Sequence, residues 1–158
     1  MGDELSYPPL VPDRTSAKAR LTTLKRAEFF RGLDVFSEAG VEDLFCLASV
    51  AEESDFAPGQ ILFREDNIAD AFHILVQGKV ELSSEKRNVR EVLGPGESAG
   101  LYSVLTRELH SATARALEET STLVVEAEDL YNVLSNNMEI VASLFRHFLN
   151  KLGINSEK

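Results

Sequence analysis

The segment from Gly94 to Ala116 holds the residues of this chain that are best suited to binding an anion. Gly94, Gly96 and Gly100 permit tight turns in which successive backbone N–H groups can face a phosphate. A short helical stretch follows, and small residues then lead up to Ala116. This order is typical of a phosphate-binding turn and makes the segment the first candidate for a binding site.

A dinucleotide site is one interpretation of these glycines. Residues 94–99, GPGESA, match the pattern G-x-G-x-x-[GA]. However, Pro95 has no N–H to offer a pyrophosphate, and the helical stretch that follows is too short to cross a sheet. Because no second βα unit is predicted either, we interpret the glycines as turn residues.

The three histidines do not predict a metal site. His73, His110 and His147 show neither H-x-x-H nor H-x-x-x-H spacing, and they fall on different predicted elements. His73 alternates with Phe72 and Ile74, which predicts a half-exposed strand face for it. His147 is expected in solvent. We expect neither a metal ion nor a cofactor.

Other reactive side chains lack the arrangement that catalysis needs. The carboxylate pairs Glu52-Glu53 and Glu118-Glu119 are expected at solvated strand ends, because adjacent strand residues point to opposite faces. Cys46 is the one cysteine, lies in an apolar run and is expected in the core. Since no Ser-His-Asp or Cys-His framework is present in the pattern, we predict no catalytic residues and no enzymatic activity.

The composition argues against several classes of partner. The 158 residues carry a formal net charge of −10, which repels nucleic acids and anionic membranes, and the 16 basic residues form no stripe. No apolar run approaches the ~20 residues of a membrane-spanning helix, and the N-terminus lacks the apolar stretch of a signal peptide. We therefore expect a cytoplasmic protein without nucleic-acid or direct membrane contact.

Helices are predicted on both sides of a β region. Residues 1–14 contain three prolines and are expected to form an extended leader. A first helix ends at Gly32, a second covers residues 41–48, and the chain from Glu128 onward is helical again. We predict one domain over residues 15–152, followed by a tail at 153–158.

Between these helices the pattern changes to short strands. Turn residues such as Pro58-Gly59 and Gln77-Gly78 separate apolar runs at short intervals. Strands this short and this regularly spaced favour an all-β barrel or sandwich over βαβ units. The β region is predicted at about residues 51–126.

The last predicted helix has more apolar residues than one buried face needs. One stripe comprises Met138, Val141, Phe145, Phe148 and Leu152, and a second comprises Ile140, Leu144 and Leu149. A helix that covers a β-roll needs one such face buried. The other would be exposed in a monomer, which favours a homodimer through this C-terminal helix unless the first helix covers it.

The order of these elements resembles the cyclic-nucleotide-binding domain superfamily from Phe29 to about Leu152. The supporting motifs are FFRGLDVFS at 29–37, FAPGQILFRE at 56–65, FHILVQGKV at 72–80 and LGPGE at 93–97. The second is similar to the family's PG-x-x-[IL]-x-x-E hairpin, and the third to its strand-G-x-V turn. The resemblance implies a mainly β fold, a β-roll of the double-stranded β-helix or jelly-roll type, with N-terminal and C-terminal helices.

The resemblance also locates a ligand pocket. The family's phosphate cassette reads F-G-E-[LIV]-A-L and, some residues later, P-R-[SA]-A-T. The matching positions here are Gly100, Leu101, Tyr102, His110, Ser111, Ala112 and Thr113. Leu101 stands where the family's glutamate holds the ribose 2′-hydroxyl. His110 stands where its arginine pairs with the cyclic phosphate.

These two departures from the family pattern predict a lower affinity for the nucleotide. Arginine holds a phosphate through a fixed two-pronged fork, and hydrogen bonds to charged groups contribute roughly 1.5–3 kcal/mol each. Losing several would weaken binding by about 10³-fold. We predict a regulatory or sensor module that does not bind cAMP or cGMP in the family's usual mode.

Two alternatives stay open. The domain could bind a cyclic nucleotide or another anion weakly or in a different mode, or it could be a structural dimerisation module of a larger protein. The module could stand alone, or it could be part of a larger protein whose effector domain lies elsewhere and is its partner.

Overall fold

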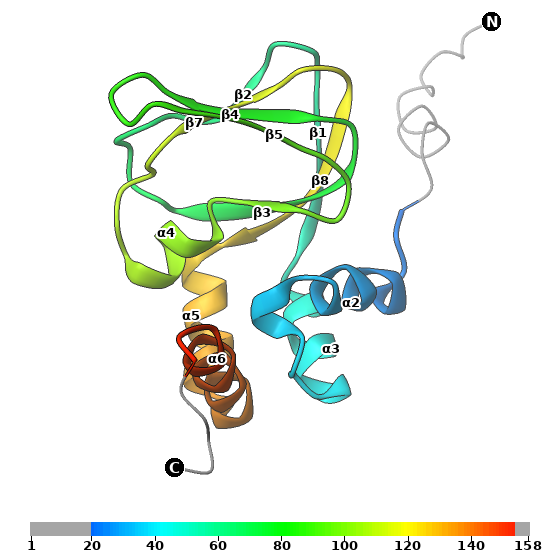
Figure 1. Cartoon of the computed structure of the whole chain (residues 1–158). Coiled ribbons are helices and arrows are strands. Elements are labelled where there is room, and N and C mark those ends of the chain that lie inside the picture. Colours follow the sequence, from blue (N-terminus) through cyan, green and yellow to red (C-terminus); the bar gives the residue numbers. More distant parts are fainter. Residues whose placement is uncertain (1–19, 154–158) are drawn as a thin grey trace, which may run out of the picture.

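Two four-stranded antiparallel sheets face one another in the computed structural model, which describes residues 20–153 (Figure 1). The strands are β1 (Glu52–Phe56), β2 (Ile61–Phe63), β3 (Ala71–Gln77), β4 (Val80–Ser84), β5 (Val89–Leu93), β6 (Ser98–Ala99), β7 (Thr113–Ala116) and β8 (Thr120–Glu126). Their order is β1-β8-β3-β6 in one sheet and β2-β7-β4-β5 in the other. The predicted mainly β roll with flanking helices is confirmed, while the expected leader at 1–14 lies outside the described residues.

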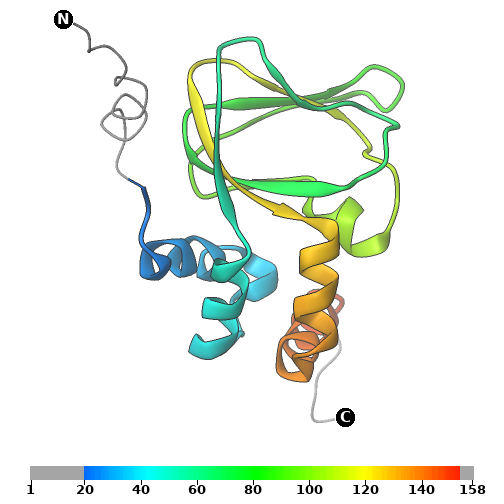
Figure 2. The same ribbon diagram turned by 180° about the vertical axis from the view of Figure 1, so that it is seen from behind.

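The helices gather on one side of the roll (Figures 1 and 2). They are α2 (Thr23–Arg31), the 3₁₀ helix η2 (Asp34–Phe36), α3 (Val41–Ser49), α4 (Leu101–Thr106), α5 (Ala127–Ser135) and α6 (Met138–Lys151). Thr22 caps α2 by accepting a hydrogen bond from the Lys25 N–H, and Gly32 ends that helix as predicted. Only α4 lies at the edge of the roll, next to the glycine-rich turn.

Strand β3 is buried on both of its faces. Phe72 and Ile74 belong to the apolar core that the helices share with the roll. His73 and Leu75 face the interior of the roll, where the ring of Phe63 from β2 lies near His73. His73 is therefore only 6% exposed, and the prediction of a half-exposed face was wrong. Alternation along a strand indicates exposure only when one face meets water, and here helices cover the other.

Two further side chains lie differently from the prediction. Cys46 is half-buried and not in the core, because Leu44, Leu47 and Ala48 occupy the buried face of α3. His147 is half-buried and not fully solvated, and its Nε2 is enclosed without a hydrogen-bond partner among residues 20–153. Neither residue lies near the glycine-rich turn in sequence, and neither enters the site described below.

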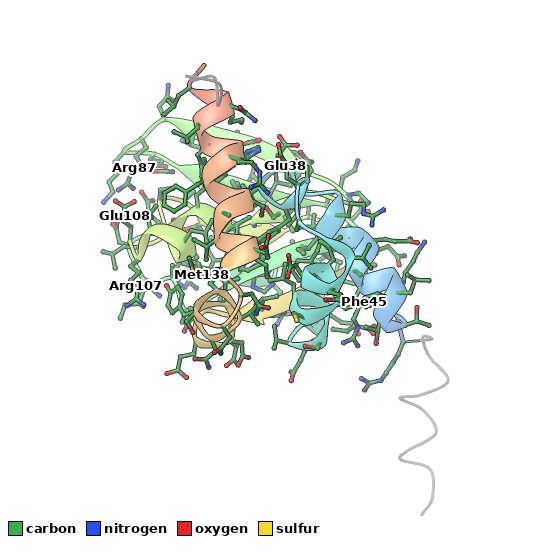
Figure 3. The ribbon with its side chains drawn as sticks, turned by 90° about the horizontal axis from the view of Figure 1, so that it is seen from below. Glu38, Phe45, Arg87, Arg107, Glu108 and Met138 are labelled. Atoms are coloured by element: carbon green, nitrogen blue, oxygen red, sulfur yellow. The ribbon has the colours of Figure 1, made fainter. Side chains whose placement is uncertain are left out.

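Helix α6 buries two of the three residues of its second apolar stripe, while Leu149 of that stripe is 41% exposed. Ile140 is fully buried and Leu144 is 8% exposed, and both join the core beneath the roll. Met138, Phe145 and Leu152 of the other stripe are 65–74% exposed. Figure 3 shows α6 from below, with Met138 near its start. An apolar face of this helix thus remains in contact with solvent in the single chain.

Candidate functional site

A pocket of about 290 Å³ lies between α4 and the sheet that contains β2, β4 and β5. Its lining residues are Phe63, Leu82, Glu91, Leu93, Ser98, Gly100, Leu101, Tyr102, Ser103, His110, Ser111 and Ala112. Six of the seven residues predicted from the cassette pattern therefore come together here. Thr113 does not line the pocket, because its Oγ1 accepts a hydrogen bond from the Glu65 N–H at 3.0 Å.

The backbone keeps the shape of a turn followed by a short helix. Gly100 has a φ of +89°, a conformation that side-chain-bearing residues rarely adopt, and α4 begins at the next residue. Tyr131 of α5 holds this helix by donating its hydroxyl to the Val104 carbonyl at 2.6 Å. The Arg107 guanidinium covers the Tyr131 ring at 4.2 Å from its centroid. The cassette helix is thus fixed to the C-terminal helices.

Leu101 cannot replace the family's ribose-binding carboxylate. Its side chain is 3% exposed and belongs to the apolar core together with Val104. A leucine offers no hydrogen bond, so a sugar hydroxyl placed there would lose its contact with water and gain no partner. The neighbouring Tyr102 is 50% exposed.

His110 lies flat against Phe63 inside the roll. The ring centroids are 3.7 Å apart with an interplanar angle of 12°. The residue is 2% exposed, and its Nε2 has no hydrogen-bond partner among the described residues. Burial lowers the pKa of His110, while the negative charge of Asp70 acts in the opposite direction. The ring is therefore neutral at physiological pH.

The pocket contains no cationic side chain among its lining residues. Glu91 is the one formally charged residue there, and it is exposed. The guanidinium of Arg87 lies close by, but it donates to the Glu65 carboxylate at 2.6 Å and to the Ser111 carbonyl at 3.2 Å. Figure 3 labels Arg87. An anion in the pocket would meet a carboxylate and no free positive charge.

Sequence reasoning missed the side of the pocket that the strands provide. Phe63, Leu82 and Leu93 belong to separate strands and show only the apolar character of core positions. Phe63 stood in a motif that pointed to the family, but nothing in the motif indicates that its ring stacks on His110. Arg87 belongs to a polar hairpin turn, and no local pattern predicts its contact with Ser111.

The comparison with known families decides the classification. The family model of the cyclic nucleotide-binding domain matches residues 53–137. The chain belongs to this family. It is therefore a regulatory domain of the cyclic-nucleotide-binding type, and the ligands of the family are cyclic nucleotides.

Individual relatives agree with this classification. The chain is 31% identical to lysophospholipase nte1 of Neurospora crassa over 58% of this chain and 7% of the lysophospholipase. It is 24% identical to a cGMP-dependent protein kinase of Drosophila melanogaster over 72% of this chain and 13% of the kinase. The N-terminal domain of a transcriptional regulator from Streptomyces coelicolor A3(2) is a similar solved structure, with a TM-score of 0.69 and 26% identity over 78% of this chain and 91% of that one.

The chain thus spans only a small part of these two curated relatives, in which domains of this type sit inside larger proteins. Over residues 20–153, no group of His, Cys, Asp and Glu side chains could hold a metal ion. Over the same residues, no helix has the length and apolar character to cross a bilayer.

Proposed function

We propose that this domain is a non-enzymatic regulatory module that retains the β-roll of its family but does not hold cAMP or cGMP in the usual mode. The observation that carries the proposal is the stacking of His110 on Phe63. It puts a neutral, buried ring at the position that the family resemblance assigns to the phosphate-binding arginine. The module would then respond to a signal other than the tight binding of a cyclic nucleotide.

The electrostatics of the pocket support this proposal. A cyclic phosphate carries a full negative charge that needs a cation or several donors once it leaves water. The lining residues supply a neutral imidazole and the carboxylate of Glu91. With Leu101 also unable to bond the ribose, the loss amounts to about 10³-fold in affinity.

A second candidate function is a sensor that binds a cyclic nucleotide or another anion weakly or in a different mode. Two observations favour it. The glycine turn before α4 keeps its left-handed conformation at Gly100, and the pocket volume of about 290 Å³ is near the lower end of ligand sites. The hydroxyls of Ser98, Ser103 and Ser111 line the same pocket and can donate to a ligand oxygen.

We also propose the setting in which the module works. The exposed face of α6 supports a homodimer, or a structural dimerisation role, through this C-terminal helix. The small share of the relatives that the chain covers supports an effector domain elsewhere in a larger protein. A cytoplasmic location without nucleic-acid or direct membrane contact is in keeping with the net charge of −10.

Calorimetric titration with cAMP and with cGMP tests the ligand proposal. We expect no measurable heat from the native chain at tens of micromolar nucleotide. The double variant Leu101→Glu with His110→Arg restores both family residues and is expected to bind at least tenfold more tightly. The single variant Tyr102→Phe is the matched control. It alters the wall of the pocket without adding a group that could bind the phosphate or the ribose, so it should behave as the native chain.

Each result has a clear consequence. Binding of either nucleotide by the native chain at micromolar concentration would contradict the proposal and favour the weak or altered sensor. A folded double variant that gains nothing would mean that the shape of the pocket, and not only its charge, excludes the nucleotide.

A further inference from the structure

Four aromatic rings form a continuous row through the interior of the roll. The Phe56 ring of β1 meets the edge of His73 on β3 at 5.6 Å between centroids. His73 lies 6.1 Å from Phe63 on β2, and Phe63 stacks on His110 at 3.7 Å. The row therefore connects the first sheet, the second sheet and the loop between α4 and β7.

Both imidazoles in this row occupy environments suited to a neutral ring. His73 and His110 are 6% and 2% exposed. The Nδ1 of His73 lies 3.1 Å from the Thr122 hydroxyl, and the Nε2 of His110 has no hydrogen-bond partner in the described part of the chain. A proton added to either ring would place a positive charge against phenyl rings and away from water.

Charged groups near the row compensate such a proton only in part. The charged or titratable groups that face the two imidazoles are Asp70 in the loop before β3 and Glu91 on β5. In addition, the two histidines face each other. Arg87, which reaches the same loop from the β4–β5 turn, already pairs with Glu65. Only Asp70 raises the pKa of His110, and burial outweighs it.

Burial and, as the smaller cause, the charge of a protonated His110 together lower the pKa of His73 to about 4. The two rings thus oppose each other's protonation. His110 lines the pocket beside α4 and His73 does not, so we expect acid to act on His110 first.

His110 is also the point at which three segments of the pocket meet. The backbone N–H of His110 donates to the Asn67 carbonyl at 2.9 Å. The backbone carbonyl of His110 accepts from the Asp66 N–H at 2.8 Å. A Cβ placed on Gly100 would lie 3.0 Å from Cε1 of the His110 ring, so the ring also packs against the start of α4. Movement of this ring would loosen the cassette turn and the loop before β3 together.

We propose that the Phe63–His110 stack, backed by His73, is an acid-sensitive latch that closes the cassette loop onto the roll at neutral pH and releases it in acid. Protonation favours the released state, because the released His110 ring binds a proton with its ordinary affinity and the stacked ring binds a proton more weakly. The opening begins below about pH 6.5, the ordinary pKa of histidine, and increases as the pH falls. The latch would act whether or not the pocket holds a ligand.

Hydrogen–deuterium exchange of the whole chain at pH 7.5 and pH 5.5, corrected for intrinsic exchange rates, tests the latch. One titrating ring that is free at ~6.5 and whose pKa is lowered in the stack increases the open population by up to about tenfold at pH 5.5. We expect amides of residues 100–113 to lose protection by up to this factor beyond any loss in β8, which reports the decrease in global stability. The variant His110→Phe, which keeps a stacked ring but cannot titrate, should abolish the effect, and His147→Gln on α6 should retain it.

If the phenyl ring does not fit, His110→Leu serves the same purpose, since it fills the site without a titrating group. An equal loss of protection in β8 and in residues 100–113 would mean global unfolding and would overturn the latch. A loss of protection that persists in a folded His110→Phe or His110→Leu variant would overturn it as well.

Discussion

The imidazole of His110 rests on the phenyl ring of Phe63, 3.7 Å between centroids and 12° from parallel, at the position where the family resemblance predicts an arginine. The contact joins the loop before β7 to β2 in the second sheet. A residue at a position that the family resemblance assigns to ligand binding thus packs the cassette against the roll. Stability and ligand chemistry are linked at this position.

Replacing His110 by alanine should therefore destabilise the fold. The substitution removes a ring that is 2% exposed and leaves a cavity beside Phe63 and Gly100. We expect a loss of about 2 kcal/mol in the free energy of unfolding, measured by urea denaturation at pH 7.5. Ser111→Ala, next in the same loop but exposed, should cost less than about 0.5 kcal/mol. Equal losses for the two variants would mean that the stack adds no stability.

The turn between β3 and β4 gives a second prediction. Gly78 has a φ of +101°, and a Cβ added there would lie 2.5 Å from the Glu119 carbonyl oxygen. Gly59 has a φ of +87° but open space around it. Gly59→Ala should cost only the conformational strain, about 1–2 kcal/mol, whereas Gly78→Ala should cost several kcal/mol because backbone must also move. Thermal unfolding of the two variants measures the difference, and similar melting temperatures would contradict it.

The sequence predicts the order of elements well because local signals determine it. Gly32 ends α2, and the turn at Gly78 separates β3 from β4. Short, regularly spaced strands indicate a β-roll without any knowledge of how they pair. The cassette register likewise follows from Ser111, Ala112 and Thr113, which are contiguous in the chain.

The environment of single residues is harder to predict because it depends on contacts between distant segments. The burial of His73 requires both the covering helices and the opposite sheet. The stack of His110 on Phe63 joins residues 47 positions apart, and no local pattern reports it. The sequence therefore indicates that position 110 departs from the family pattern. It does not indicate which contact the His110 side chain makes there.

His73 makes one contribution to the pH dependence of global stability. Its pKa in the folded chain is lowered to about 4 from an ordinary value of 6.5, so the unfolded chain binds a proton that the folded chain does not. Stability is then fully present above about pH 6.5 and falls as the pH decreases toward 4, by about 3 kcal/mol at most.

Urea denaturation at a series of pH values measures this slope. His73→Gln removes one titrating group and keeps a side chain that can bond the Thr122 hydroxyl, so it should make the curve between pH 6.5 and 4 less steep. His147→Gln is the control and should leave the slope unchanged. A His73→Gln curve as steep as that of the native chain would assign the acid sensitivity to other groups.

The exposed stripe of α6 leads to the prediction about assembly. Met138, Phe145 and Leu152 are spaced by seven residues and are 65–74% exposed, while Val141 and Phe148 between them are half-buried. A seven-residue repeat of this kind places apolar side chains along one seam of a helix, as two-stranded helix pairs require.

The surface beside this seam is apolar as well. A groove of about 470 Å³ separates α6 from α4, and its lining residues are Tyr102, Leu105, Thr106, Leu134, Val141, Leu144, Phe145 and Phe148. A second copy that pairs through α6 could place its own exposed side chains there, so the groove extends the surface that a dimer would bury.

We therefore expect a dimer in sedimentation experiments at micromolar concentration. Phe145→Glu introduces a charge into the seam at a residue that is 65% exposed, so it should yield a folded monomer that lacks only the stabilisation due to dimerisation. Asn150→Glu adds the same charge to an exposed position of the same helix outside the seam and should remain dimeric. Ile140→Ala, at a fully buried position, should instead lower the free energy of unfolding by about 2–4 kcal/mol. A native chain that sediments as a monomer, with Phe145→Glu indistinguishable from it, would show that the seam does not pair two copies of this chain.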